Sequence, residues 1–152
     1  MKYIWRVFYM DQRILTKLDE LEQIISELGE FFPATDTEYV NSKITQRAVE
    51  RLVQISVECV IDVCAMLVKN LRLGVPSSEA DYFEKLEGIV FDHEMTEHLQ
   101  MMRRFRNRVV HRYGDLNQAQ VYEIVLKSFG DFERFQHHVR KYLKKSRNSP
   151  SA

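Results

Sequence analysis

Residues 103–117 read RRFRNRVVHRYGDLN, and this stretch concentrates the side chains most capable of chemistry. Five arginines, a histidine and a tyrosine occupy its first eleven positions. Apolar side chains recur near helical spacing through it, at Leu99, Met102, Val109 and Val110. This spacing predicts a helix that ends at Gly114. Because the helix dipole favours cations in the last turn, the arginines fit a solvated basic helix end as well as a functional site.

The composition of the whole chain predicts an all-α fold. Its 152 residues are 45% hydrophobic, which is enough for one domain with its own core. Five glycines and three prolines are few breakers, which favours an antiparallel bundle of about five long helices. Residues 1–100 hold 10 Lys and Arg against 18 Asp and Glu, whereas residues 101–152 hold 12 against 4. This asymmetry indicates either an anionic partner or a match between acidic and basic helices.

Apolar periodicity and breakers place the expected helices along the chain. The first begins near residue 11 and ends at Gly29 and Pro33, and a polar connection follows. The other helices are expected over residues 42–73, 79–90, 94–113 and 115–143. Asp92 is the expected cap of the helix that carries the basic stretch, and Asp115 or Asn117 caps the last helix.

These helices suggest a division of the chain into three parts. Residues 1–10 are an N-terminal extension, residues 11–145 form the helical domain, and residues 146–152 form a disordered basic tail. Within the domain, residues 52–68 are apolar almost all round. This pattern predicts burial on several sides, by other helices or by a second copy of the chain.

Within the basic stretch, the pattern Arg106-Asn107-x-x-x-His111 resembles the motif of the HEPN superfamily. Tyr113, two residues further on, resembles the HepT-like branch of that superfamily, and the similarity extends over roughly residues 10 to 145. The resemblance implies a dimeric HEPN-like bundle, a metal-independent ribonuclease toxin, and a minimal nucleotidyltransferase as its antitoxin. It also implies that this partner neutralises the toxin by transferring AMP from ATP onto Tyr113.

The motif residues suit RNA cleavage without a metal ion or cofactor. His111 can take or give a proton near neutral pH, and Arg106 can clamp phosphate oxygens with its planar guanidinium. Asn107 lies one turn before His111 and is expected to orient it. Positions five apart differ by about 140° around a helix, so Arg106 is expected to reach in from the side. The remaining arginines are expected to bind RNA, namely Arg103, Arg104, Arg108 and Arg112.

One motif supplies one histidine, whereas the reaction needs both a base and an acid. A two-fold homodimer that apposes two motif helices would supply both. Glu58 and Asp62 are candidate supporting residues, since they share a face of the second long helix with Arg51 and Gln54. They form either a thin solvated stripe or a pair of carboxylates that contact the motif arginines or raise the pKa of His111.

Other features of the sequence limit the remaining classes of function. Cys59 and Cys64 have no metal-ligand spacing and are expected to be buried free thiols. The chain lacks a transmembrane segment and a signal peptide, so a cytoplasmic protein is expected. Two alternatives to a ribonuclease toxin stay open. One is a noncatalytic helical dimer that binds and regulates a nucleotidyltransferase, and the other is a plain helical interaction module.

Overall fold

The computed structural model describes residues 2–111 and 116–149, and these ranges contain six helices and no strand. The helices are α1 (Lys2–Phe31), α2 (Asp36–Val40), α3 (Lys43–Asn70), α4 (Glu79–Leu86), α5 (His93–His111) and α6 (Gln118–Asn148). The all-α prediction is therefore confirmed. The helix that carries the basic stretch is α5, and its last described residue is His111.

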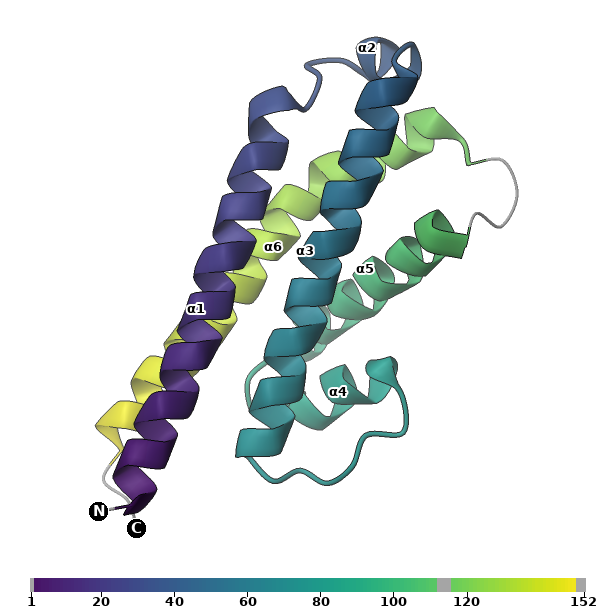
Figure 1. Ribbon diagram of the computed structural model, residues 1–152. Coiled ribbons are helices and arrows are strands. Elements are labelled where there is room, and N and C mark those ends of the chain that lie inside the picture. Colours follow the sequence, from purple (N-terminus) through teal and green to yellow (C-terminus); the bar gives the residue numbers. More distant parts are fainter. Residues whose placement is uncertain (1, 112–115, 150–152) are drawn as a thin grey trace.

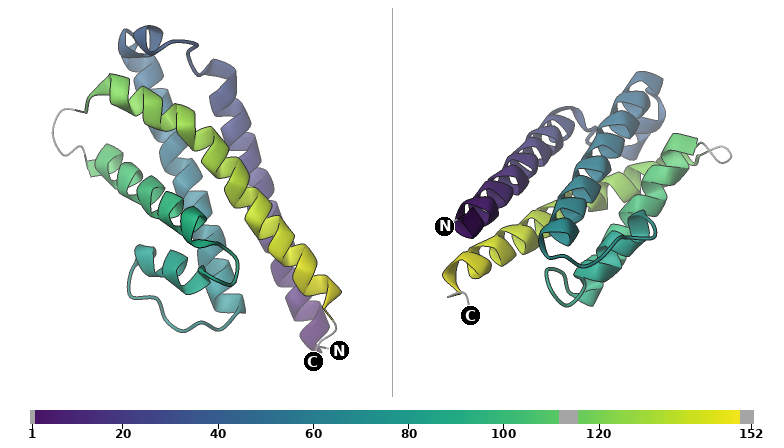
Figure 2. Two further views of the ribbon diagram at one scale, coloured as in Figure 1. Left: turned by 180° about the vertical axis from the view of Figure 1, so that it is seen from behind. Right: turned by 60° about the horizontal axis from the view of Figure 1, so that its bottom comes forward.

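The bundle is organised around α3, which contacts α1, α2, α4 and α5 (Figure 1). Helix α1 lies along one side of α3, and α4 and α5 cover the other side (Figure 1). Seen from behind, α6 runs diagonally across the molecule and packs against α1, α2 and α5 (Figure 2). The start of α1 and the end of α6 therefore lie together at one end, and the end of α5 lies at the other.

Caps expected from the sequence are found at the start of α5, which carries the basic stretch, and at the start of α6, which follows it. The Asp92 carboxylate accepts a hydrogen bond from the Met95 backbone N–H at 2.8 Å, at the start of α5. The Asn117 side chain accepts one from the Gln120 N–H at 3.2 Å, at the start of α6. Each bond satisfies a donor that the first turn of a helix leaves unpaired.

Several helix boundaries differ from the expectation. Helices α3 and α4 end at Asn70 and Leu86 rather than at residues 73 and 90. Helix α1 begins at Lys2 rather than near residue 11, so the N-terminal extension continues the helix of the domain. The expected polar connection contains α2, which Thr35 caps. Helix α6 continues to Asn148, so residues 146–148 are helical rather than disordered, and residues 150–152 lie outside the described ranges. Apolar periodicity missed the first turns of α1 because their large apolar side chains are exposed.

The apolar segment of α3 is buried by other helices of the same chain. Val53, Val57, Val60 and Leu67 are at most 2% exposed, and four helices surround α3. Packing within one chain therefore accounts for residues 52–68, and their apolar character is no evidence for a second subunit. Support for a dimer has to come from another face of the molecule.

Candidate functional site

Arg106 lies between α5 and α4 rather than in open solvent. Its side chain is 13% exposed, and its Nη2 donates a hydrogen bond to Oε2 of Glu79 at 2.6 Å. Its Nε is buried and has no partner within the described residues. Glu79 is the first residue of α4 and follows the N-cap Ser78. A carboxylate on another helix therefore holds the guanidinium in place.

A second contact joins the start of α4 to the motif helix. Gln100 Nε2 donates to the Ala80 carbonyl oxygen at 3.0 Å, and Gln100 Oε1 accepts from Arg103 Nε at 3.3 Å. Gln100 is buried, so these bonds satisfy an amide that would otherwise be costly to bury. Arg103 is consequently tied to α5 itself, unlike the exposed arginines further along the helix.

A separate face of α5 is exposed and basic. Four exposed residues follow one another along this face at intervals of three, four and three residues, namely Met101, Arg104, Arg108 and His111. Asn107, which is half-buried, lies one turn before His111, as expected. Arg106 faces α4 instead, consistent with the offset of about 140° between positions five apart on a helix. Arg112 and Tyr113 lie outside the described residues.

Within the described residues, neither of the two carboxylates that could support the motif contacts it. Asp62 pairs with Lys17 of α1, with 3.5 Å between Oδ2 and Nζ. Glu58 accepts a hydrogen bond at 3.0 Å from Gln54, one turn earlier on α3. The expectation that these residues face the motif helix is therefore wrong within one chain. The side of α3 that meets α5 carries Val53 and Val57, and Asp62 projects from another side.

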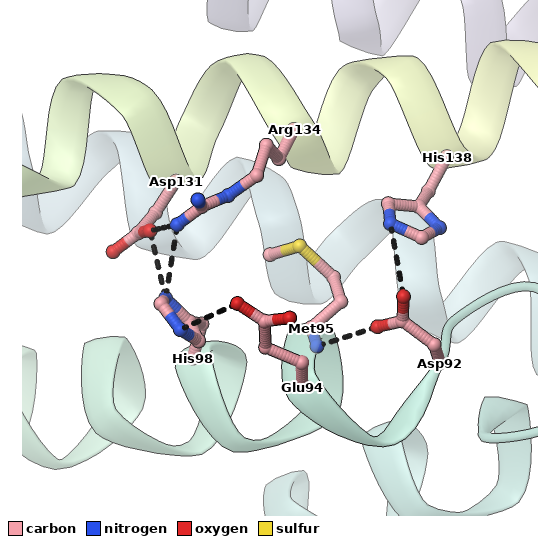
Figure 3. A network of polar contacts seen from close by, with 7 residues as sticks. All are labelled: Asp92, Glu94, Met95, His98, Asp131, Arg134 and His138. Atoms are coloured by element: carbon pink, nitrogen blue, oxygen red, sulfur yellow. Dashed lines mark hydrogen bonds and ion pairs between the residues drawn. The ribbon is translucent and has the colours of Figure 1, made fainter.

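The polar contacts that hold α5 against α6 are shown in Figure 3. His98 Nδ1 lies 2.7 Å from Oδ1 of Asp131, which also contacts Arg134 of α6. His98 Nε2 lies 3.9 Å from Glu94 on its own helix. At the start of α5, Asp92 lies 4.0 Å from His138 of α6. His98 is thus part of the network that fixes the position of the motif helix.

Other classes of site find little support within residues 2–111 and 116–149. These ranges contain no group of three or more His, Cys, Asp or Glu side chains arranged to hold a metal ion. Cys59 and Cys64 are buried free thiols, as expected, and burial raises the pKa of both. No described helix is long and apolar enough to cross a membrane.

Sequence reasoning missed Glu79 and Asp131, two carboxylates of other helices that contact α5. Glu79 is 27 residues from Arg106 along the chain, and Asp131 is 33 residues from His98. No local spacing marks either contact. A buried arginine is normally paired, so Arg106 would be expected to have a carboxylate partner on another helix. The sequence does not show which carboxylate that is.

Comparisons with known proteins support the HEPN resemblance. A family model described as "Ribonuclease HepT-like" matches residues 21–139. The chain is 23% identical over 131 residues to a tRNA nuclease HepT of Aphanizomenon flos-aquae, covering 86% of this chain and 89% of the relative. It is 25% identical over 127 residues to an mRNA nuclease HepT of Shewanella oneidensis, covering 83% and 95%.

Solved structures share the fold. The tri-AMPylated HEPN toxin of Shewanella oneidensis in complex with MNT antitoxin superposes with a TM-score of 0.78 at 24% identity, covering 84% of this chain and 96% of that one. YutE, a cytosolic protein of unknown function from Bacillus subtilis, superposes with a TM-score of 0.74 at 18% identity, covering 92% and 94%. At these identities the likeness concerns the fold alone.

Proposed function

Because the chain belongs to the HepT-like ribonuclease family, we propose that it is the toxin of a toxin–antitoxin system and acts as an endoribonuclease. The observation that carries the proposal is the exposed basic face of α5. There His111 stands with Arg104 and Arg108, inside the stretch that the family model matches. A proton carrier among exposed cations suits a substrate built on phosphates.

The proposed reaction needs no metal ion. The 2′-oxygen of a ribose loses its proton and attacks the adjacent phosphorus, and the 5′-oxygen leaves with a proton. His111 carries one of these protons, and Asn107, one turn earlier on α5, orients its ring. Arg106 stabilises the charge on the phosphate oxygens, for which its guanidinium exchanges the Glu79 carboxylate for the substrate. Arg103, Arg104, Arg108 and Arg112 hold the RNA backbone on either side.

A homodimer completes the site in this proposal. One chain supplies one His111, whereas a two-fold axis beside α5 brings a second copy of the same face into one cleft. Met101 supports this placement, because it is an apolar side chain exposed on that face. Sedimentation velocity should show a dimer at micromolar concentration. A monomer under those conditions would contradict the composite site.

The partner in the proposal is a minimal nucleotidyltransferase that acts as the antitoxin. The Tyr113 hydroxyl oxygen attacks the α-phosphorus of ATP on the partner, and pyrophosphate leaves. The product carries a phosphodiester charge and a bulky nucleoside within five residues of Arg108 and Arg112 along the chain. These arginines then bind the attached phosphate in place of the substrate, so activity falls without a change of fold.

The decisive experiment is cleavage of RNA by the purified chain in the presence of EDTA. His111→Ala should lower the rate by about 10²- to 10⁴-fold, the usual contribution of a general acid or base. Arg106→Ala and Arg106→Lys should also fail to cleave RNA. Alanine has no cation, and the lysine ammonium cannot make the bidentate contact with the phosphate. Arg51→Ala, at an exposed position of α3, is the matched control and should cleave normally. Cleavage that needs a divalent metal and survives His111→Ala would overturn the mechanism.

The ion pair of Arg106 with Glu79 favours a second candidate function. An arginine already held by a carboxylate suits a structural role, in which the chain is a noncatalytic dimer that binds and regulates a nucleotidyltransferase. In that case neither the wild type nor the Arg106 variants would cleave RNA. Adding the purified chain to the nucleotidyltransferase would still change the rate at which that enzyme uses ATP.

A further inference from the structure

The first three turns of α1 display an unusual set of side chains. Six large apolar residues in positions 3–9 are each between 51% and 74% exposed, namely Tyr3, Ile4, Trp5, Val7, Phe8 and Tyr9. They precede residue 21, where the match to the family model begins. Exposed apolar residues are ordinary when scattered, but a contiguous group indicates an interaction surface.

A groove lies beside this surface, where the start of α1 meets the ends of α3 and α6. Apolar side chains, among them Leu67, form part of its lining, and Tyr3 and Tyr142 add aromatic rings. Arg6, Lys69 and Arg72 bring positive charge to the same lining. Aromatic rings beside cations are the combination with which proteins bind the bases and phosphates of single-stranded nucleic acids.

Arg72 connects the groove to the exposed aromatic surface. Its Nη2 donates to the Tyr3 hydroxyl oxygen at 2.8 Å, and its guanidinium carbon lies 6.0 Å from the centre of that ring. Arg147 lies in a similar way over Phe8, at 5.8 Å. Arg72 also has a φ of 54°, the left-handed conformation that glycine adopts most easily after a helix. An arginine is thus held at a position where its backbone is strained.

The charge at this end of the molecule is strongly positive. Residues 2–11, 69–72 and 140–148 contain nine Lys and Arg and a single carboxylate, Asp11. Asp11 is buried and pairs with Arg147 at 3.3 Å, and Arg140 pairs with Asp19 at 3.1 Å. Within the described part of the chain the other seven cations form no ion pair. The complementary occupant of this positive surface is an anion.

We propose that this end of the protein binds a single-stranded segment of RNA, with bases on the aromatic rings and phosphates on the cations. The choice of RNA as the anion rests on the proposed function. The groove also favours a strand over an anionic lipid surface, since three of the cations lie inside a concavity that a flat bilayer does not enter. Helix α6, with 31 residues, places this site about 45 Å from the motif end, so the two sites contact different parts of one substrate.

Trp5 makes the proposal directly measurable, because it is the only tryptophan of the chain and is exposed on this surface. The probe is a single-stranded oligonucleotide of about 12 nucleotides, within the usual site sizes. Its riboses carry 2′-O-methyl groups, so it has no 2′-hydroxyl proton and cannot be cleaved. Titration into the full-length wild-type chain should quench the Trp5 fluorescence saturably.

Two double variants, each reversing two charges near opposite ends of α3, then test where the RNA binds. Lys69→Glu with Arg72→Glu should weaken binding at least tenfold and reduce the slope of log K against log salt by about 1.4, since each phosphate contact contributes about 0.7. Lys43→Glu with Arg51→Glu changes charge equally at the opposite end of α3 and should leave binding within about twofold. Thermal melting of both variants shows whether each is folded. If the first pair fails to fold, Lys144→Glu with Lys145→Glu, both exposed on α6, replaces it.

The outcomes separate this inference from the proposed function. Quenching that depends on Lys69 and Arg72 supports the site even if the chain cleaves no RNA. Cleavage without any Trp5 response overturns the site and leaves the ribonuclease intact. Equal weakening by both pairs also overturns it, because binding would then follow net charge alone. If Trp5 fluorescence shifts to the blue with phosphatidylserine vesicles but does not change with RNA, this end binds membranes, and the proposal is refuted.

Discussion

Replacing Glu79 by alanine removes the carboxylate that contacts Arg106 and should destabilise the protein by about 1.5 kcal/mol. Hydrogen bonds to charged groups contribute about 1.5 to 3 kcal/mol, whereas exposed ion pairs contribute about 0.2 to 1 kcal/mol. The pair lies between these cases, because Arg106 is 13% exposed and Glu79 is 43% exposed. Without Glu79, the guanidinium of Arg106 stays largely buried with no carboxylate to pair its charge. Its Nε already lacks a hydrogen-bond partner in the described chain.

The assay is thermal unfolding at one fixed protein concentration, because the melting temperature of an oligomer depends on concentration. For a domain of this size, 1.5 kcal/mol corresponds to a decrease of about 3 to 6 °C. Glu84→Ala is the matched control. Glu84 is exposed on the same helix and forms no ion pair within the described residues, so its loss should shift the melting temperature by less than about 1 °C.

A double-mutant cycle isolates the contact itself. Arg106→Ala and Glu79→Ala should be less destabilising in combination than the sum of their separate effects, with a coupling of about 1 kcal/mol or more. Equal shifts for Glu79→Ala and Glu84→Ala, together with no coupling, would refute the reasoning. The contact would then contribute nothing to stability, and α4 would be held by apolar packing alone.

Three further predictions concern other sites. Tyr113→Phe should stay toxic yet escape AMPylation by the partner, and intact-mass analysis after co-expression checks this; equal silencing of the variant would mean inhibition by binding alone. The hydrogen bond at 2.6 Å to Glu87 raises the pKa of His93, so this contact stabilises the fold below the ordinary histidine pKa and is lost as pH rises through the raised one. Glu87→Gln should lower that pKa in an NMR titration, and an unchanged titration would contradict the assignment. Burial raises the pKa of Cys59 and Cys64, so neither should react with a thiol reagent until urea unfolds the chain, and rapid labelling of the native protein would contradict their burial.

Much of the helical framework could be predicted from the residues alone, because helix signals are local. Asp92 could be predicted as a cap, and Asn117 as one of two candidates with Asp115, since a cap and the N–H that it satisfies lie three residues apart. The burial of Ile14, Leu18 and Leu21 followed from their spacing on one helix face. The same helical geometry placed His111 one turn after Asn107 and away from Arg106.

Contacts between helices could not be predicted in this way. The spacing of residues on one helix is set by its 3.6-residue period, but which two helices meet depends on how all the apolar faces pack together. Only the tertiary structure therefore pairs Arg106 with Glu79, His98 with Asp131, and Asp62 with Lys17. The start of α1 shows the same limit. Its apolar residues are exposed rather than buried against another helix. Only the packed structure shows that they border a basic groove between three helices.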